Sequence, residues 1–594
     1  MTQSGVKFDP SINAYFNALI RETGGWSWHP RQREFVFSHP ESCSSLHVPC
    51  HFRSLGGRHM LGAGLLLDDG EGPQPIPFRE AVAWTLTLPS LRGLSSRVTR
   101  ESFRYRVQRS EENLQVARAY RTECVSPDDI LPRRFIDSEQ ALVNGHSIHP
   151  CPKDRGNMSQ EEASAFAPEY AGEFPLIWYS VEAASLQCHE STDSTLDRAV
   201  DALLRHESAP IRAAAAEARA NGHRVIPCHP FQHRHWQAHP DLKALQANGQ
   251  LRSLGLGAVP WQATSSLRGI WSDEADWMLK FSLSVRITNS LRHLQPKEAV
   301  RGPALADLIR TPPAARWQAR HPGFTVLAEP VAAAIRSPAG QPLAETTLVF
   351  RTNPFQGADA DHCELLASLL QDDPATGLSR LGTCLQARHA GEAGARAWFH
   401  AYLEHVVKPL LDAQGNLGLL FGAHQQNLIL KLDDDFQPVA AWFRDCQGTG
   451  FSALAHQRFG PALKATIADS DNELPDTLAV PLFCYYLFIN STFNVITSLA
   501  AAGLCPEQTL WQQLRQWLQQ RLAESPADPG ALHYLLDSPT LHAKNNFLCS
   551  LRALNENTLE DLEAIYHPMP NPLVTIRQAH TRERKTHDAA IFAH

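Results

Sequence analysis

KFSLSVRIT, residues 280–288, is the most strand-like stretch of the chain. Its apolar and polar residues alternate throughout, which predicts a β-strand with one buried face and one polar face. Alternation is also typical of an ordinary surface strand whose polar face meets water. The continuation favours a binding role, because a helix that begins at Thr288 or Asn289 brings Arg292 one turn further on. Thr288, Arg292 and the helix amides then face one anion.

Predicted strands and helices are mixed along the chain, which indicates an α+β fold. Up to about Arg134, short hydrophobic runs alternate with Pro/Gly breaks. A helix is expected over residues 196–220 and is ended by Asn221-Gly222. A short strand over residues 224–227 and a histidine-rich loop should follow it.

Two hairpins are expected further along. Residues 325–336 and 346–351 look like the arms of the first, and the chain beyond about Asp359 is mostly helical apart from the second. We therefore place a domain boundary near the first hairpin.

Composition limits the class of protein. With 594 residues, 43% of them hydrophobic, the chain is long enough for about two to four units of ordinary domain size. A net charge of −8 gives no basic excess for a nucleic-acid backbone, so nucleic acid is not an expected partner. The twelve cysteines are scattered without a C-x-x-C pair, and the N-terminus has no apolar stretch of the signal-peptide kind. A reduced, cytoplasmic protein is expected.

One uncharged segment, Leu478–Leu504, is long enough to cross a membrane. Pro481 lies near its start, polar residues interrupt its second half, and its apolar residues recur near helical spacing. These features favour a buried core helix and no membrane.

Two cationic segments have the composition of anion sites. His146, His149 and Lys153 follow an Asn-Gly turn, although each alone is an ordinary loop residue. The loop Thr264-Ser265-Ser266-Leu267-Arg268 offers three hydroxyls and a guanidinium, which suit phosphate oxygens. The alternative for this loop is a simple turn.

A third segment carries oxygen ligands. His424-Gln425-Gln426-Asn427 precedes a strand at Leu428–Lys431, and a turn and a strand at Val439–Phe443 lead to Asp445. This hairpin brings Asn427 and Asp445 to neighbouring strand ends, where an amide oxygen and a carboxylate can hold Mg²⁺ against nucleotide phosphates.

The familiar sequence motifs of nucleotide-binding proteins and hydrolases are absent. The chain has no P-loop, no complete dinucleotide fingerprint and no G-x-S-x-G elbow. Zinc is an alternative for two further segments, but neither matches a standard zinc spacing, and we interpret His233 and His235 as solvated loop histidines. The two segments contain His229, His233 and His235, and His47, Cys50 and His51.

These segments, from about Asn144 to the C-terminus, resemble those of the NRPS-independent siderophore synthetases, the aerobactin-synthetase-like ligases. The markers are residues 145–150 with Lys153 and Gly156, residues 229–232, 264–268, 280–292 and 424–427, and Arg444-Asp445.

The resemblance implies a hand-like α+β enzyme with mixed and antiparallel sheets and a helix-rich palm. Residues 1–134 are then thumb-like, 135–340 fingers-like with the ATP and carboxylate motifs, and 341–594 palm-like. It further implies that ATP, with Mg²⁺, adenylates a carboxylate of citrate or a related polycarboxylic acid and releases pyrophosphate. An amine or alcohol then forms an amide or ester. A homodimer is also implied.

Residue roles are carried over from the same resemblance. Nucleotide contacts are assigned to Lys153, Thr264, Ser265, Ser266, Arg268, Lys280, Gln426, Asn427 and Asp445, the last two also to Mg²⁺. Substrate contacts are assigned to His146, His149, Thr288, Arg292, Arg351 and His424. The catalytic candidates are His149, Arg292 and His424, and either histidine can take the proton that the incoming ammonium loses.

The chain departs from the family pattern at three places. Gly422 stands where an acidic residue is usual, Ser147 where proline is usual, and Arg351-Thr352-Asn353-Pro354 where an Arg-Glu-Asn-Pro-like motif is usual.

Two other functions stay open. A small-molecule kinase-like phosphotransferase has a similar His, Asn, strand, turn, strand, Asp order, but Gln425 and Gln426 supply no catalytic carboxylate. A non-catalytic protein that binds citrate and nucleotide is conceivable because of Gly422.

Overall fold

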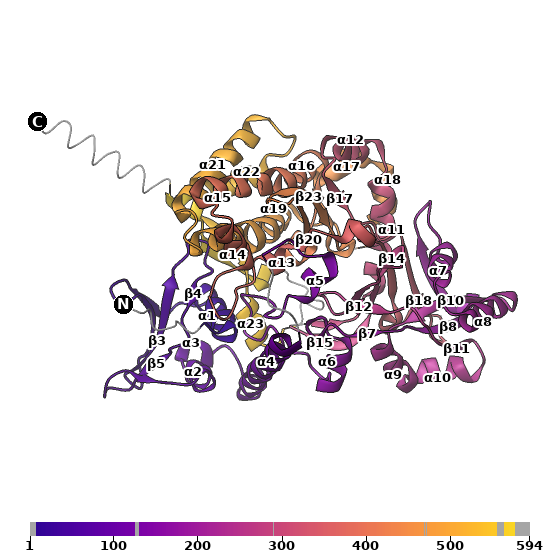
Figure 1. Ribbon diagram of the computed structural model, residues 1–594, viewed down its shortest axis with the longest axis horizontal. Coiled ribbons are helices and arrows are strands. Elements are labelled where there is room, and N and C mark those ends of the chain that lie inside the picture. Colours follow the sequence, from indigo (N-terminus) through magenta and orange to yellow (C-terminus); the bar gives the residue numbers. More distant parts are fainter. Residues whose placement is uncertain are drawn as a thin grey trace, which may run out of the picture.

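The computed structural model describes residues 8–124, 130–288, 290–467, 470, 472–554 and 563–576. Helix α1 (Pro10–Glu22) and a six-stranded antiparallel sheet form the N-terminal part, at one end of the molecule in Figure 1. The Asp9 carboxylate caps α1 by accepting from the backbone N–H groups of Ser11 and Ile12. The strands are β1 (Trp26–His29), β2 (Glu34–His39), β3 (Ser44–Phe52), β4 (Met60–Leu61), β5 (Leu66–Asp68) and β6 (Gln74–Pro75).

The C-terminal helix α23 (Asn546–Leu551) completes this N-terminal core. The ring of Phe547 packs edge-on against Tyr15 and Phe103. The half-buried Glu22 carboxylate accepts from the N–H groups of Phe547 and Leu548 at 2.8 and 2.9 Å. Burial raises the pKa of Glu22 to about 8. The two ends of the described chain are therefore held together.

A seven-stranded antiparallel sheet lies at the centre of the chain, and a three-stranded sheet lies beyond it with α7 and α8 at the other end of the molecule (Figure 1). The seven strands, in sheet order, are β7 (Glu173–Phe174), β12 (Trp261–Ala263), β13 (Gly269–Trp271), β14 (Trp277–Phe281), β19 (Leu348–Thr352), β18 (Val331–Ile335) and β9 (Leu186–Glu190). The three strands are β10 (His223–Cys228), β8 (Ile177–Glu182) and β11 (Leu251–Leu256).

The predicted strand over residues 280–288 is two strands. β14 ends at Phe281 in the central sheet, and β15 (Leu283–Ile287) pairs only with β16 (Ser290–Arg292) among the described strands. Ser282 makes the break, because its hydroxyl donates to Ala344 O at 2.6 Å and accepts from Leu294 N at 2.8 Å. A side chain that bonds backbone in this way competes with the regular strand ladder.

The prediction of a helix that begins at Thr288 or Asn289 is wrong. Thr288 has a left-handed backbone, with φ of +56°, and turns the chain from β15 into β16. Asn289 lies outside the described residues.

The helix predicted over residues 196–220 is two helices, α7 (Leu196–Leu204) and α8 (Ala209–Ala220). The predicted end at Asn221-Gly222 and the strand that follows are confirmed by α8 and β10. The prediction of a histidine-rich loop after this strand is wrong, because residues 230–238 form α9 (Pro230–Ala238). His233 is half-buried on α9, with Nδ1 2.7 Å from the Tyr179 hydroxyl, so it is not a solvated loop residue.

Both predicted hairpins are present. β18 pairs with β19, although the start of the predicted first arm is a separate strand, β17 (Phe324–Val326), which runs parallel to β23. β22 (Leu428–Leu432) and β23 (Pro438–Phe443) form the second hairpin. The mixed sheet order is β17-β23-β22-β20, with β20 at Cys363–Leu365.

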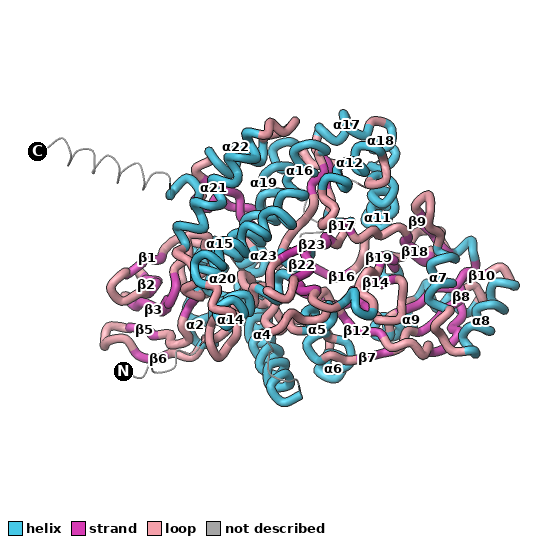
Figure 2. The backbone as a smooth tube through the Cα atoms, turned by 45° about the horizontal axis from the view of Figure 1, so that its top comes forward, coloured by secondary structure: helices cyan, strands magenta, loops and turns pink. Residues whose placement is uncertain are grey.

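Helices cover the C-terminal part of the chain (Figures 1 and 2). The larger ones there are α11 (Pro296–Leu308), α12 (Pro312–Arg320), α14 (Arg380–Ala387), α15 (Gly391–Tyr402), α16 (Lys408–Leu417), α17 (Ala453–Phe459), α18 (Pro461–Ile467), α21 (Glu507–Ala523) and α22 (Gly530–Asp537). Elsewhere lie α2 (Phe78–Thr85), α3 (Pro89–Arg92), α4 (Arg97–Cys124), α5 (Phe135–Gln140), α6 (Gln160–Phe166), α10 (Pro240–Ala247) and α13 (Leu366–Leu369). Short strands β21 (Leu419–Leu420) with β24 (Gly450–Phe451), and β25 (Thr540–Lys544) with β26 (Tyr566–Pro570), complete the described strands.

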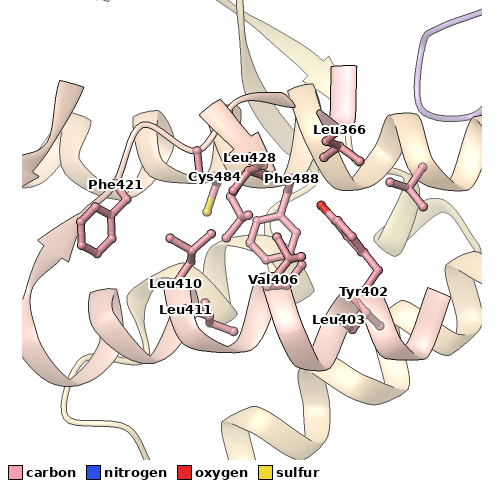
Figure 3. Packing of buried hydrophobic residues seen from close by; sticks show 14 of the residues in the cluster. Leu366, Tyr402, Leu403, Val406, Leu410, Leu411, Phe421, Leu428, Cys484 and Phe488 are labelled. Atoms are coloured by element: carbon pink, nitrogen blue, oxygen red, sulfur yellow. The ribbon is translucent and has the colours of Figure 1, made fainter. Parts of the chain in front are cut away.

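The uncharged segment is the central helix of the largest core. It comprises α19 (Asp476–Cys484), a π-helical stretch η8 (Tyr485–Thr492) and α20 (Phe493–Ala501). Residues 477–501 are long and apolar enough to cross a membrane, but 78% of their most apolar window is buried inside the protein. Figure 3 shows Cys484 and Phe488 packed among Leu410, Leu428 and Tyr402. The prediction of a buried core helix is confirmed.

We expect Phe488→Ala to lower the free energy of unfolding by about 3–5 kcal/mol, because it leaves a cavity in this core. Urea unfolding measures the change. Val439→Ala is the control, since Val439 is 42% exposed, and it should cost under about 0.5 kcal/mol. A loss below about 1 kcal/mol for Phe488→Ala would mean that the segment is not core.

Candidate active site

A cavity of about 430 Å³ gathers the predicted residues from distant parts of the chain. With the exception of Thr264, every residue that the resemblance assigned to nucleotide, metal or substrate lines this cavity. The lining includes His146, His149, Lys153, Ser265, Ser266, Arg268, Lys280, Thr288, Arg292, Arg351, His424, Gln426, Asn427 and Asp445.

The loop 264–268 is the turn between β12 and β13. The Thr264 hydroxyl donates to Gly269 O at 2.9 Å, and the Ser266 hydroxyl accepts from Gly269 N at 3.0 Å. Thr264 is fully buried behind the cavity wall, so its predicted nucleotide contact is corrected to a role in closing the turn. Leu267 has a φ of +67°, and Arg268, the next residue, lines the cavity.

Ser265 connects this turn to the β22–β23 hairpin. Its hydroxyl accepts from Arg444 Nη2 at 3.1 Å and from Gln426 Nε2 at 3.3 Å. Arg444 is itself paired with the buried Glu139 carboxylate, 2.7 Å away. The two predicted phosphate-side segments are therefore held against each other.

Lys280 and Asp445 form the central ion pair of the cavity. Lys280 Nζ lies 2.5 Å from Asp445 Oδ1 and donates to Gln447 Oε1 at 2.5 Å. Burial alone would raise the pKa of Asp445, but the Lys280 ammonium outweighs burial, with help from Arg268 and Arg351. The pKa of Asp445 is therefore held well below its usual range, and its carboxylate is charged.

Asn427 and Asp445 lie at adjacent ends of β22 and β23, as predicted. Arg444 N donates to Asn427 O at 3.0 Å, and both side chains line the cavity. Amide and carboxylate oxygens are the hard ligands that Mg²⁺ prefers, so this pair fits that ion chemically.

Gly422, which replaces the acidic residue usual in the family, is required by close packing. A Cβ atom on Gly422 would lie 2.9 Å from the carbonyl oxygen of Gly448, and Gly422 O accepts from Asn427 Nδ2 at 3.0 Å. Any side chain here would push residues 445–448 away, so this loop cannot carry the usual carboxylate in its present position.

The β15–β16 hairpin carries the predicted carboxylate-side pair. Arg292 Nη2 donates to the Thr288 hydroxyl at 2.9 Å and to Ile287 O at 3.1 Å. Thr288 and Arg292 therefore meet as predicted, but across a turn and not on a helix.

The loop after Gly145 contributes two imidazoles. His146 Nδ1 accepts from Ile148 N at 3.1 Å, and His149 Nδ1 accepts from Cys151 N at 3.2 Å. These bonds place the ring proton of each neutral imidazole on Nε2. Gly145 has a φ of +74°, and an added Cβ would lie 3.2 Å from Pro152, so the turn needs glycine.

Two predicted cations are already paired with buried carboxylates. Lys153 Nζ lies 3.0 Å from Glu169, and burial lowers the pKa of Lys153. Arg351 Nε donates to Glu329 at 2.9 Å, and Glu329 is fully buried. Both cations line the cavity but are held by the protein before any ligand arrives.

His424 is a neutral imidazole in a cationic setting. Burial lowers its pKa, Lys544, Arg444 and Arg292 add to this effect and Asp445 opposes it, so that the pKa falls to about 4. Its ring lies 5.9 Å from that of Tyr486. A neutral imidazole can accept a proton.

Several lining residues were not predicted. Arg58, Tyr486, Asn490 and Lys544 come from the N-terminal part, η8 and β25. Ser491 donates to the carbonyl of Tyr486, five residues earlier, at 3.1 Å, which fits the π-helical widening of η8. Such widenings are frequent at functional sites, but no local motif marks these positions in the sequence.

Zinc is not supported by the described part of the chain, in which no group of three or more His, Cys, Asp or Glu side chains is placed to hold a metal. His229 Nδ1 accepts from Phe231 N at 3.0 Å and caps α9. His47 Nδ1 lies 3.0 Å from the Glu34 carboxylate.

The cavity is lined by fixed cations and a neutral histidine, which suits an enzyme that brings anions together. The IucA / IucC family profile matches residues 134–371, and a profile described as ferric iron reductase FhuF-like transporter matches residues 396–560. The N(2)-citryl-N(6)-acetyl-N(6)-hydroxylysine synthase of Vibrio mimicus is 32% identical over 96% of both chains. The spermidine-citrate ligase of Bacillus anthracis is 28% identical, over 95% of this chain and 97% of its own.

Among solved structures, the ATP-bound aerobactin synthetase IucA from Klebsiella pneumoniae matches with a TM-score of 0.86 at 30% identity. The match covers 95% of this chain and 99% of that one. The chain belongs to the IucA / IucC family of NRPS-independent siderophore synthetases, and it is an enzyme.

The depressed pKa of His424 gives a testable pH dependence. We expect the His424 ring to titrate near pH 4, since burial and nearby cations disfavour its charged form, and to titrate higher when citrate and pyrophosphate fill the cavity. NMR of the ring C–H groups, assigned with His424→Gln, measures both midpoints.

The same shift affects stability. Because the folded pKa lies below the unfolded value of 6.5, the unfolded chain binds the extra proton between pH 6.5 and about 4, and stability falls as pH falls through that window. His424→Gln should lose less stability there. A ring midpoint at or above 6.5 in the free protein would contradict this account.

Proposed function

We propose that this enzyme is an ATP-dependent ligase that adenylates a carboxylate of citrate or a related polycarboxylic acid and condenses it with an amine or alcohol. The observation that carries the proposal is one cavity with two predicted sides. Arg268, Lys280 and Asp445 lie on the nucleotide side, and Thr288, Arg292 and His424 on the carboxylate side. Similarity to a citryl-hydroxylysine synthase and a spermidine-citrate ligase supports citrate as a substrate, and similarity to the ATP-bound synthetase supports ATP.

Charge supports two anionic substrates. Among the described residues, the cavity is lined by nine lysines and arginines and by three acids, Glu169, Asp372 and Asp445. A tricarboxylate that approaches a triphosphate brings like charges together, so the site must supply fixed cations before chemistry begins.

In the first step, a carboxylate oxygen attacks the α-phosphorus of ATP, and the bond from that phosphorus to the pyrophosphate oxygen breaks. The products are an acyl-adenylate and pyrophosphate. Arg268 and Lys280 are placed to neutralise the phosphates, and Arg292 to hold the attacking acid. For this, Lys280 must share its ammonium between Asp445 and a phosphate oxygen.

Asn427 and Asp445 are the residues that would hold Mg²⁺. When bound, that ion neutralises phosphate charge. Because Gly422 contributes no carboxylate, Asp445 is the acidic member of this pair, and its depressed pKa keeps it ionised.

In the second step, the amine nitrogen attacks the acyl carbon, and the bond from that carbon to the AMP oxygen breaks. The nitrogen loses a proton, and His424 or His149 is placed to take it. The pKa of His424 is too low for an efficient base in the free protein, but bound anions screen the cations that depress it.

Three further features belong to this proposal. The hand-like division into thumb-like, fingers-like and palm-like parts at about residues 134 and 340 follows from the family resemblance, as does the homodimer. A reducing, cytoplasmic setting fits the eleven described cysteines, all of which are free.

The identity of the nucleotide product tests the function. We expect Mg-ATP, citrate and an amine acceptor to yield AMP and pyrophosphate, and citrate alone to support exchange of labelled pyrophosphate into ATP. ADP would instead show a kinase-like phosphotransferase. Binding without turnover across a broad panel of acids and amines would show a non-catalytic protein.

Arg292→Ala should lower kcat/KM for the acid by about 10²–10³-fold, because it removes a partly buried cation that faces an anion. Arg286→Ala is the matched control, since Arg286 is exposed on β15 and outside the cavity lining. Thermal unfolding checks that both variants fold. Normal turnover by Arg292→Ala would remove Arg292 from the site.

A further inference from the structure

The β15–β16 hairpin stands apart from the other described sheets, yet it carries Thr288 and Arg292 into the cavity. Its ladder is irregular between Leu283 and Arg286. A two-stranded ribbon is marginally stable alone, so other parts of the protein must hold it in place.

Gln232 holds the stem of the hairpin from α9. Its side chain is 1% exposed and accepts from Ser284 N at 2.7 Å. The same amide donates to the Ser284 hydroxyl at 3.0 Å and to Glu345 O at 3.1 Å. Gln232 therefore supplies the bonds that a neighbouring strand would otherwise make at Ser284.

Arg106 holds the tip of the hairpin from α4. Its Nη2 donates to the carbonyl oxygen of Thr288 at 2.6 Å, and its Nε lies 3.1 Å from the buried Asp154 carboxylate. Asp154 lies in the loop that also carries Lys153, so Arg106 links that loop to the left-handed turn at Thr288.

Gly156 packs the same loop against the back of β15. A Cβ on Gly156 would lie 3.1 Å from Arg286 O and 3.2 Å from Arg286 N, and its φ is +56°. Arg106, Asp154, Gly156 and Gln232 are all absent from the cavity lining. Residues outside the cavity lining therefore contact the hairpin at its stem, along β15 and at its tip.

We propose that Gln232 and Arg106 are positioning residues for the carboxylate substrate. They fix the stem and the tip of the β15–β16 hairpin so that the Thr288 hydroxyl and the Arg292 guanidinium meet the acid in one geometry. The inference rests on the proposed function and extends it to residues that touch no substrate. It also gives a role to the His229-Pro230-Phe231-Gln232 motif, which begins α9 and delivers Gln232 to Ser284.

The Arg106→Lys variant tests whether Arg106 positions the tip of the β15–β16 hairpin. Lysine keeps a positive charge beside Asp154 but cannot also reach the Thr288 carbonyl in the fork geometry of arginine. We expect KM for citrate to rise about 10- to 100-fold, the range that a misplacement of about 1 Å can cause, with KM for ATP within about twofold of wild type. Citrate-dependent pyrophosphate exchange measures both constants.

Arg109→Lys is the matched control. Arg109 Nε lies 2.7 Å from the other oxygen of Asp154, but Arg109 makes no hydrogen bond to the described residues of the hairpin. A merely structural role for the Asp154 cluster would affect both variants alike. The proposal requires that only Arg106→Lys raise KM for citrate.

Gln232→Leu tests the stem, because leucine has a similar size and makes none of the three hydrogen bonds. Gln237→Leu, on the same helix but facing Tyr179, is its control. If Gln232→Leu does not fold, Gln232→Glu keeps the acceptor for Ser284 N and loses both donors, and it should show the same rise in KM for citrate.

The outcomes separate this inference from the proposed function. Wild-type protein without citrate-dependent exchange would overturn the function and this inference with it. Wild-type exchange with an unchanged KM for citrate in folded Arg106→Lys and Gln232 variants would overturn the inference alone. An equal rise in KM for ATP would show general damage to the site and would also overturn it.

Discussion

The ion pair between Lys280 and Asp445 is the constraint on which the site depends. It joins the end of β14 in the central sheet to the end of β23, across 165 residues of sequence. Lys280 is buried and Asp445 is half-buried, so their charges are only partly screened by water and act strongly on each other. Together with the hydrogen bond from Arg444 to the Ser265 hydroxyl, this contact holds the central sheet against the β22–β23 hairpin.

Other cations of the cavity are held in the same way. Lys153 pairs with Glu169, Arg351 with Glu329, and Arg444 with Glu139. Such pairs contribute little net stability, because desolvation offsets their attraction, but they fix cations in place before substrates bind. Fixed charges need no reorganisation during reaction, which is the usual source of electrostatic catalysis. Burial, with Lys544, Arg444 and Arg292, lowers the pKa of His424 and keeps its imidazole neutral.

The residue types of the site were predictable, and the shapes of the segments were less so. Arg268, Lys280, Arg292 and Asp445 were selected because phosphate, carboxylate and Mg²⁺ demand particular side chains and because their segments resemble a known family, and the structure brings all four to one cavity. The alternation over residues 280–288 predicted strand correctly, but the break at Ser282 depends on Ala344 and Leu294, which no local pattern reveals. The break between β14 and β15 could therefore not be predicted from the sequence alone.

The same limit explains the remaining errors. A turn at Thr288 replaces a predicted helix, and the Thr288 carbonyl in this turn accepts from Arg106 of α4, a residue far away in sequence. Gly422 resembled a lost ligand, whereas its contact with Gly448 shows a packing requirement. His233 resembled a loop residue because its partner, Tyr179, is far away in sequence.

The most direct measurement of the central claim is a crystal structure with a non-hydrolysable Mg-ATP analogue and citrate bound together. The account requires phosphates beside Arg268 and Lys280, the metal beside Asn427 and Asp445, and citrate against Thr288 and Arg292, all within one cavity. Citrate bound on a separate surface, or phosphates that do not contact Lys280, would contradict it.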